Sequence, residues 1–144
     1  MAFYPATCYF EATPVSLGRG TSLPFQVYGH PNMTGYDYSF TPKSVPGAKN
    51  PPQLNKLCHG VNLSNMSDEE IWKRGVDLSY VIAAYKNLNI GDHFFRPFFE
   101  LLVGTDYVRK MIIEGKSAEE IKSRWKGDVE KFKEQRKPYL LYQE

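Results

Sequence analysis

The pattern of the chain changes at Ser67, and this change restricts the fold more than any other feature. Before Ser67, short apolar runs are separated by segments rich in Gly and Pro, as in strands joined by loops. The expected strands are Cys8–Phe10, Phe25–Tyr28 and Leu57–Leu63, and the expected loops are Pro31–Gly35 and Pro42–Pro52. After Ser67, apolar residues recur at helical spacing. The predicted class is α+β, a loop-rich half of mixed strands covered by about three helices.

Two of these helices begin with the same signal, Ser-x-x-Glu. Ser67 with Glu70 and Ser117 with Glu120 have the spacing of a capping box, in which the serine and the glutamate each satisfy a free backbone N–H group. The last helix then presents one apolar stripe, formed by Ile121, Trp125, Val129 and Phe132. The mixed charges on its other face indicate exposure to solvent and not a nucleic-acid surface.

The ends of the helices are also marked in the sequence. Gly75 weakens the first helix or splits it. The second helix is expected to begin near Thr105 and to stop at Gly115. Pro138 ends the third, and the final run Tyr139–Tyr142 is predicted to be a closing strand.

Size and composition restrict the class of protein further. With 144 residues the chain is expected to form a single domain, residues 1–144. Its formal net charge of +2 gives no argument for nucleic-acid binding, and no apolar run approaches the roughly 20 residues of a membrane span. The first residues have no signal-peptide pattern. Neither the two cysteines nor the three histidines have metal-ligand spacing, so no metal and no cofactor are expected. Cys8 and Cys58 are either buried thiols or, in an exported protein, a disulfide.

The segment from Glu11 to Thr21 carries the most chemistry. It contains a carboxylate, three hydroxyl groups and a guanidinium, and two glycines bracket Arg19. A turn at Gly18–Gly20 would present backbone N–H groups beside the five donors of the guanidinium, which suits a carboxylate or a set of sugar hydroxyls. The candidate substrate-binding residues are Glu11, Thr13, Ser16, Arg19 and Thr21. The alternative is a glycine-rich turn with a purely structural Glu11–Arg19 pair.

Glycoside hydrolysis normally requires two carboxylates at a set separation. The strand half offers only Glu11 and Asp37. Asp37 lies between two tyrosines in an expected loop, where an aspartate more often forms a turn. The catalytic residues are therefore unknown at this level.

The residues around Arg19 resemble a known family. The run from Phe10 to Thr21 and the following Leu23–Gln26 are similar to exo-β-N-acetylmuramidases of glycoside hydrolase family 171, formerly a domain of unknown function. The resemblance extends over the whole chain through further landmarks, namely Gly29, Pro31, Cys58-x-Gly60-Val61, Leu102-x-Gly104, Arg109, the last-helix residues Ile121, Trp125 and Phe132, and Tyr139–Tyr142. Two positions depart from the family: Ala12 stands where Gly is common, and Pro14 where Asn is common, so any sugar contact of that Asn is lost.

The resemblance implies a function and a partner. Members of this family release N-acetylmuramic acid from the non-reducing end of peptidoglycan fragments, and they are longer, with an amino-terminal Rossmann-like domain that carries the proposed catalytic glutamates. The chain would then be the carboxy-terminal part, with Glu11–Thr21 facing the substrate cleft. The strand half would also carry an exposed apolar surface, where the other domain packs. A periplasmic or secreted location is also implied.

Two other interpretations stay open. The chain can be a carbohydrate-binding module that acts alone, or a structural interaction domain without a ligand. Binding of muramic acid by the isolated chain would separate these two.

Overall fold

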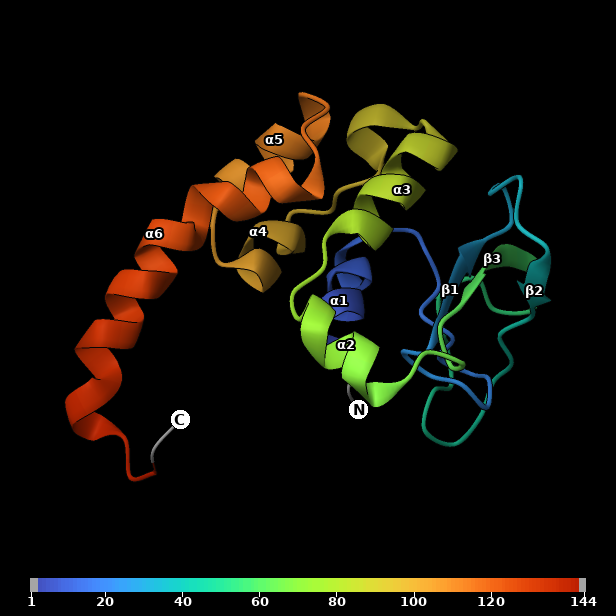
Figure 1. Ribbon diagram of the computed structural model, residues 1–144. Helices are drawn as coiled ribbons and strands as arrows, with labels where there is room; N and C mark the ends of the chain where they lie inside the picture. Colours follow the sequence, from blue (N-terminus) through green and yellow to red (C-terminus); the bar gives the residue numbers. More distant parts are fainter. Residues whose placement is uncertain (1–2, 143–144) are drawn as a thin grey trace.

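The computed structural model describes residues 3–142 and consists of a small sheet beside a larger helical body, from which the last helix projects (Figure 1). The strands are β1 (Val27–His30), β2 (Tyr38–Phe40) and β3 (Cys58–Asn62). The helices are α1 (Tyr4–Thr7), α2 (Asp68–Arg74), α3 (Ser79–Leu88), α4 (Phe98–Val103), α5 (Tyr107–Ile113) and α6 (Ala118–Arg136), with 3-10 turns η1 (Cys8–Ala12), η2 (Gly91–His93) and η3 (Lys137–Tyr139).

The sheet is antiparallel, with strand order β1-β3-β2. Gly29 of β1 lies opposite Gly60 of β3, and on its other side it exchanges two backbone hydrogen bonds with Ser16. A Cβ on Gly60 would overlap the carbonyl oxygen of Tyr28, so the close approach of the two strands requires glycine there. The sheet thereby fixes the middle of the Glu11–Thr21 segment.

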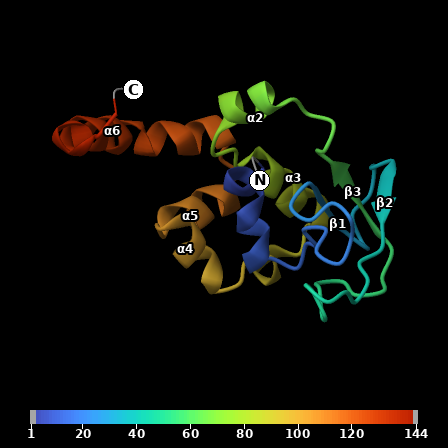
Figure 2. The same cartoon turned by 90° about the horizontal axis from the view of Figure 1, so that it is seen from below.

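The core lies between the sheet and the helices. Alternation along β1 turns Tyr28 towards the helical body, where its ring stacks on Phe10 of η1 at 4.7 Å. Val27 points to the other face, into a second small cluster with Phe40 and Cys58. Figure 2 shows the same body from below, with α6 extending away from it.

Local sequence signals set the helix boundaries as predicted. Both capping boxes form, because Ser67 and Ser117 accept from the N–H groups of Glu70 and Glu120, whose side chains bond back to the caps. Gly75, with φ +57°, ends α2, so the first expected helix is divided into α2 and α3. The predicted α+β class is confirmed.

Four expectations about elements need correction. The run Cys8–Phe10 forms the 3-10 turn η1 and no strand, because its side chains are buried in the helical core and not paired in the sheet. In the run Tyr139–Tyr142, Tyr139 is the last residue of η3 and the three residues after it are exposed, so the run forms no strand. Strand β2 and helix α4 were not expected from the pattern, being only 3 and 6 residues long. The first strand begins at Val27 rather than Phe25, whose φ of +63° places it in a turn.

The most exposed apolar surface was also expected on the strand half, but the structure places it elsewhere. The large apolar side chains with the greatest exposure are Trp72 on α2, Leu101 on α4 and three residues after α6, Tyr139, Leu141 and Tyr142. They belong to the helical half. Across the described part of the chain, no helix combines the length and the apolar character that a membrane crossing requires.

Candidate functional site

The loop that carries Arg19 is held by tight backbone contacts. Gly18 and Gly20 have φ values of +73° and +82°, which side-chain-bearing residues rarely adopt. A Cβ on Gly18 would lie 2.5 Å from Cγ2 of Val27, and one on Gly20 would overlap the carbonyl oxygen of Lys43. The predicted glycine turn is therefore present, and the loop is pressed against the sheet and the 42–52 segment.

Arg19 projects from this turn beside Glu11. Its Nη2 donates to Oε1 of Glu11 at 2.5 Å, and its guanidinium lies over the Phe25 ring, 5.0 Å from the centroid. The side chains are 43% and 23% exposed, respectively. No other hydrogen bond joins the guanidinium to residues 3–142, so most of its five donors face solvent. This arrangement leaves a cation oriented and accessible.

The pair borders an open hollow of about 280 Å³. One wall comes from η1 and the Arg19 loop, and the other from the loop after β2. The lining residues are Phe10, Glu11, Val15, Leu17, Arg19 and 48–52. Lys49 and Asn50 of the second wall were not predicted, because nothing in the sequence indicates that residues about 30–40 positions away fold against Glu11.

The three hydroxyl candidates bond to the backbone of the same segment. Thr13 and Ser16 are buried; Thr13 Oγ1 donates to the Phe10 carbonyl, and Ser16 Oγ accepts from the N–H of Gly18. Thr21 Oγ1 donates to the Gly18 carbonyl and accepts from the N–H of Leu23. Their hydroxyls shape the turn that presents Arg19.

The positions that depart from the family pattern have structural partners. The Pro14 carbonyl accepts a hydrogen bond from Nε2 of Gln53, and the Ala12 carbonyl accepts one from the N–H of Arg96. Asp37 is exposed in the loop before β2 and does not line the hollow. Among the residues that the structure describes, no three His, Cys, Asp or Glu side chains gather as a metal site would need.

Comparison with known proteins gives the class of domain. The family model described as "Exo-beta-N-acetylmuramidase NamZ, C-terminal" matches residues 2–142. The chain belongs to this family of carboxy-terminal domains. It is 33% identical to the peptidoglycan β-N-acetylmuramidase NamZ of Bacillus subtilis (strain 168), over 96% of this chain and 36% of that protein.

A solved structure agrees with this assignment. The crystal structure of a DUF1343 family protein from Bacteroides fragilis NCTC 9343 is 80% identical and superposes with a TM-score of 0.97. The match covers 99% of this chain and 40% of that one. The chain thus spans well under half of the length of the relatives it matches.

Proposed function

We propose that the chain binds the N-acetylmuramic acid end of peptidoglycan fragments at the Glu11–Arg19 hollow, as the carboxy-terminal part of an exo-β-N-acetylmuramidase. The observation that carries the proposal is the accessible Glu11–Arg19 pair on a domain of the NamZ family. The second wall of the hollow also offers the apolar side chains of Ala48, which is half-buried, and Pro52, which is exposed, and the less polar face of a sugar ring can pack against them.

Arg19 fits the group that distinguishes muramic acid. Muramic acid differs from glucosamine by a lactyl ether that ends in a carboxylate, and a guanidinium binds a carboxylate through two parallel hydrogen bonds. The Phe25 ring and Glu11 orient the guanidinium without using most of its donors. Glu11 can accept from sugar hydroxyls, while Thr13, Ser16 and Thr21 act by holding the turn.

Catalysis is assigned to a different part of such an enzyme. Of the described residues that line the hollow, Glu11 alone carries a carboxylate, and it is paired with Arg19. A glycosidase needs a second carboxylate about 5–10 Å away. We therefore expect no turnover of a chromogenic N-acetylmuramide by the purified 144-residue chain, and the catalytic groups to lie in the Rossmann-like amino-terminal domain of the longer relatives. Turnover that Glu11→Gln abolishes would instead make Glu11 catalytic.

The test is discrimination between two sugars. Arg19→Ala should weaken N-acetylmuramic acid binding about tenfold or more, because charge-assisted hydrogen bonds contribute roughly 1.5–3 kcal/mol each. N-acetylglucosamine lacks the carboxylate, and its affinity should change much less. Both affinities are measured by nuclear magnetic resonance titration of the isolated chain and of the chain joined to the amino-terminal part of the Bacteroides fragilis relative.

Arg19→Lys is the matched variant. It keeps the charge but loses the planar fork of donors, so it should recover only part of the preference for the muramic sugar. Equal losses for both sugars, together with a lower melting temperature, would show that Arg19 is structural and that the carboxylate is recognised elsewhere.

A further inference from the structure

We propose that the projecting part of α6 and the residues after it are the docking surface for the domain that makes up the rest of the longer relatives. This surface, here called the α6 face, consists of Trp125, Val129, Phe132, Tyr139 and Leu141. It lies on the helical half, and the proposal does not depend on sugar binding at Arg19.

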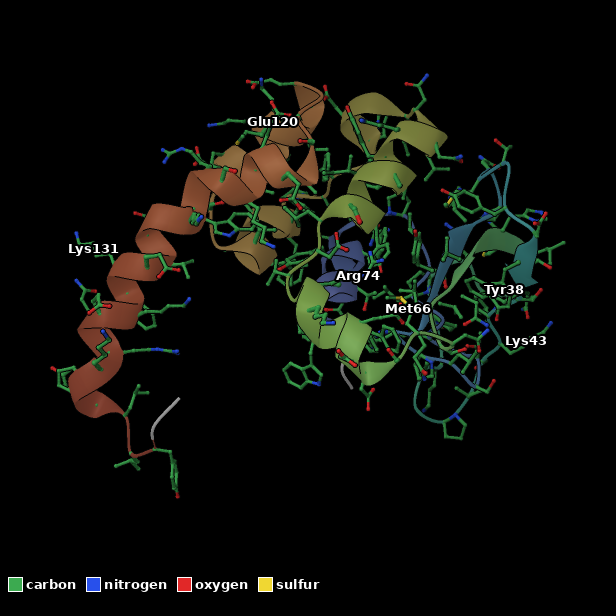
Figure 3. The ribbon with its side chains drawn as sticks, in the orientation of Figure 1. Tyr38, Lys43, Met66, Arg74, Glu120 and Lys131 are labelled. Atoms are coloured by element: carbon green, nitrogen blue, oxygen red, sulfur yellow. The ribbon has the colours of Figure 1, made fainter. Side chains whose placement is uncertain are left out.

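The exposure of α6 increases along its length. Ile121 is fully buried, Trp125 is half-buried, Val129 is 42% exposed and Phe132 is 60% exposed. These residues follow one another at intervals of three or four and so lie on one side of the helix. Figure 3 shows the contrast at two labelled residues, with Glu120 where α6 begins on the body and Lys131 on the part that projects. An apolar stripe on a helix normally faces a core, but the second half of this one faces solvent.

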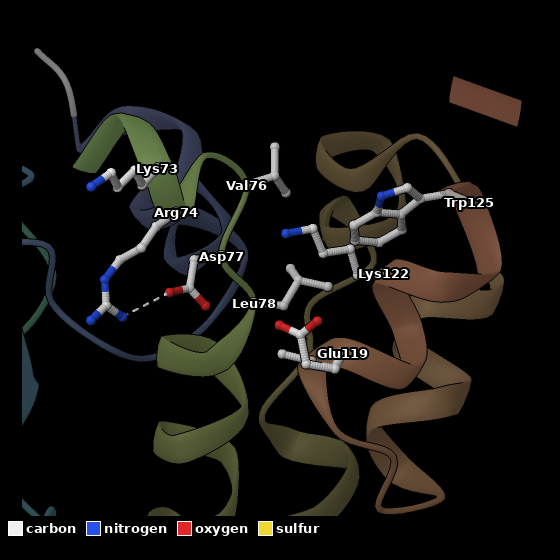
Figure 4. Close-up of a pocket in the computed structure, with 9 residues that line it drawn as sticks. Lys73, Arg74, Val76, Asp77, Leu78, Glu119, Lys122 and Trp125 are labelled. Carbon is white, nitrogen blue, oxygen red and sulfur yellow. Dashed lines mark hydrogen bonds and ion pairs between the residues drawn. The ribbon is translucent and has the colours of Figure 1, made fainter. Parts of the chain in front are cut away.

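The stripe continues into grooves on the body. Trp125 and Val129 line a mainly apolar hollow of about 270 Å³ together with Tyr9, Val103 and Tyr107. Trp125 also closes a neighbouring hollow of about 260 Å³, where Val76 and Leu78 face it across the gap from the segment between α2 and α3 (Figure 4). The α6 face is therefore continuous with partly apolar hollows on the body, which extend the surface that a partner can cover.

The position of α6 is the same in a longer protein. Residues 125–142 are 18 of the 144 in the chain, so a displacement of all of them far from their counterparts would reduce the TM-score to about 0.88. The observed value against the Bacteroides fragilis structure is 0.97. The projecting helix thus keeps its place in a chain of which this domain is only 40%.

The remainder of such a chain is the occupant that these facts favour. It is present in the relative that shares the α6 position, and it is large enough to cover an extended helix and the adjoining grooves. The two sites are also close along η1, because Tyr9 lines the groove beside α6 and Glu11 lines the Arg19 hollow. One domain seated on α6 can therefore approach both sides of η1.

Hydrogen exchange tests the proposal. The 144-residue chain is compared with a chimera in which it replaces the matching part of the Bacteroides fragilis protein. The amides of residues 126–136 should exchange at least about tenfold more slowly in the chimera, because docking removes a projecting helix from water. Val129→Asp combined with Phe132→Asp in the chimera should abolish this protection.

Gly127→Asp is the matched control. It adds the same type of charge about 140° around the helix from Phe132, and a Cβ there meets open space, so the protection should persist. The Bacteroides fragilis protein, which crystallised as a folded chain, gives the same comparison without a chimera. Equal exchange with and without the additional domain would overturn the proposal. So would a dimer of the isolated chain in sedimentation whose α6 amides are already protected, since that assigns the face to a second copy.

Discussion

Arg19 and Glu11 form an ion pair that contributes little to folding. Both side chains are partly exposed, and pairs of this kind stabilise a protein by about 0–1 kcal/mol. The Phe25 ring adds an attraction of similar size. Because these two interactions together stabilise the fold so little, fold stability alone is a weak explanation for a guanidinium at the mouth of the hollow. For the same reason, an Arg19 variant can lose ligand binding without losing its fold.

The two cysteines give a prediction at the residue scale. Both are buried free thiols, and burial raises the pKa of Cys58 to about 11, an effect that the charge of Lys56 only partly offsets. Burial also raises the pKa of Cys8, and the nearby carboxylate of Glu11 adds to the effect. The thiols are then protonated at pH 8, so iodoacetamide should modify neither in the native protein and both after unfolding. Mass spectrometry of a time course measures this, and rapid labelling of Cys8 in the folded chain would contradict it.

At the scale of elements, close backbone contacts determine how the strands pair, and serine caps determine where α2 and α6 begin. The β1–β3 pair places two glycines opposite each other, which allows the two strands to approach closely. On the other edge of β1, Ser16 bonds to Gly29 and so links the sheet to the Arg19 loop. Helices α2 and α6 each begin with a serine cap, which fixes their first residues independently of the packing behind them. The Arg19 loop thus depends on the sheet, whereas Glu11 belongs to η1, which packs in the helical core.

Two glycine substitutions should therefore have opposite effects. Gly60→Ala places a methyl group on the Tyr28 carbonyl, where backbone must move, and we expect a loss of about 3 kcal/mol or more in the free energy of unfolding. Gly127→Ala lies in the exposed middle of α6 with open space around it and should stabilise the helix by about 0.5–1 kcal/mol. Urea denaturation of both variants measures these changes. A Gly60→Ala protein as stable as the parent would show that the strands can separate without cost.

At the scale of the whole molecule, the packed core extends only as far as Trp125, and the later part of the chain projects from it. The helical core includes Ile121 and reaches Trp125, whereas from residue 131 to 142 every described side chain is exposed except Arg136, which is half-buried. The first part of α6 therefore stabilises the fold, and the exposed later part forms most of the docking surface.

Truncation measures this separation. Removing residues 131–144 should change the free energy of unfolding of the isolated chain by less than about 1 kcal/mol, because surface residues contribute little. Ile121→Ala should cost about 2–5 kcal/mol, since it empties a fully buried position. Urea denaturation of the two variants gives both values, and a truncated chain that cannot fold would place the end of α6 within the stability core.

The sequence by itself determined the features that depend on neighbours three to eight positions apart. The capping boxes, the break at Gly75, the turn at Gly18–Gly20 and the pairing of Glu11 with Arg19 were all predictable, because short-range geometry and backbone conformation alone specify them. Only the tertiary structure decided that Cys8–Phe10 forms a 3-10 turn instead of a strand, that Lys49 and Asn50 line the same hollow as Glu11, and that α6 leaves the body after Trp125. The physical reason is that a short apolar run is buried equally well as a strand or a helical turn, so packing against distant residues selects between them.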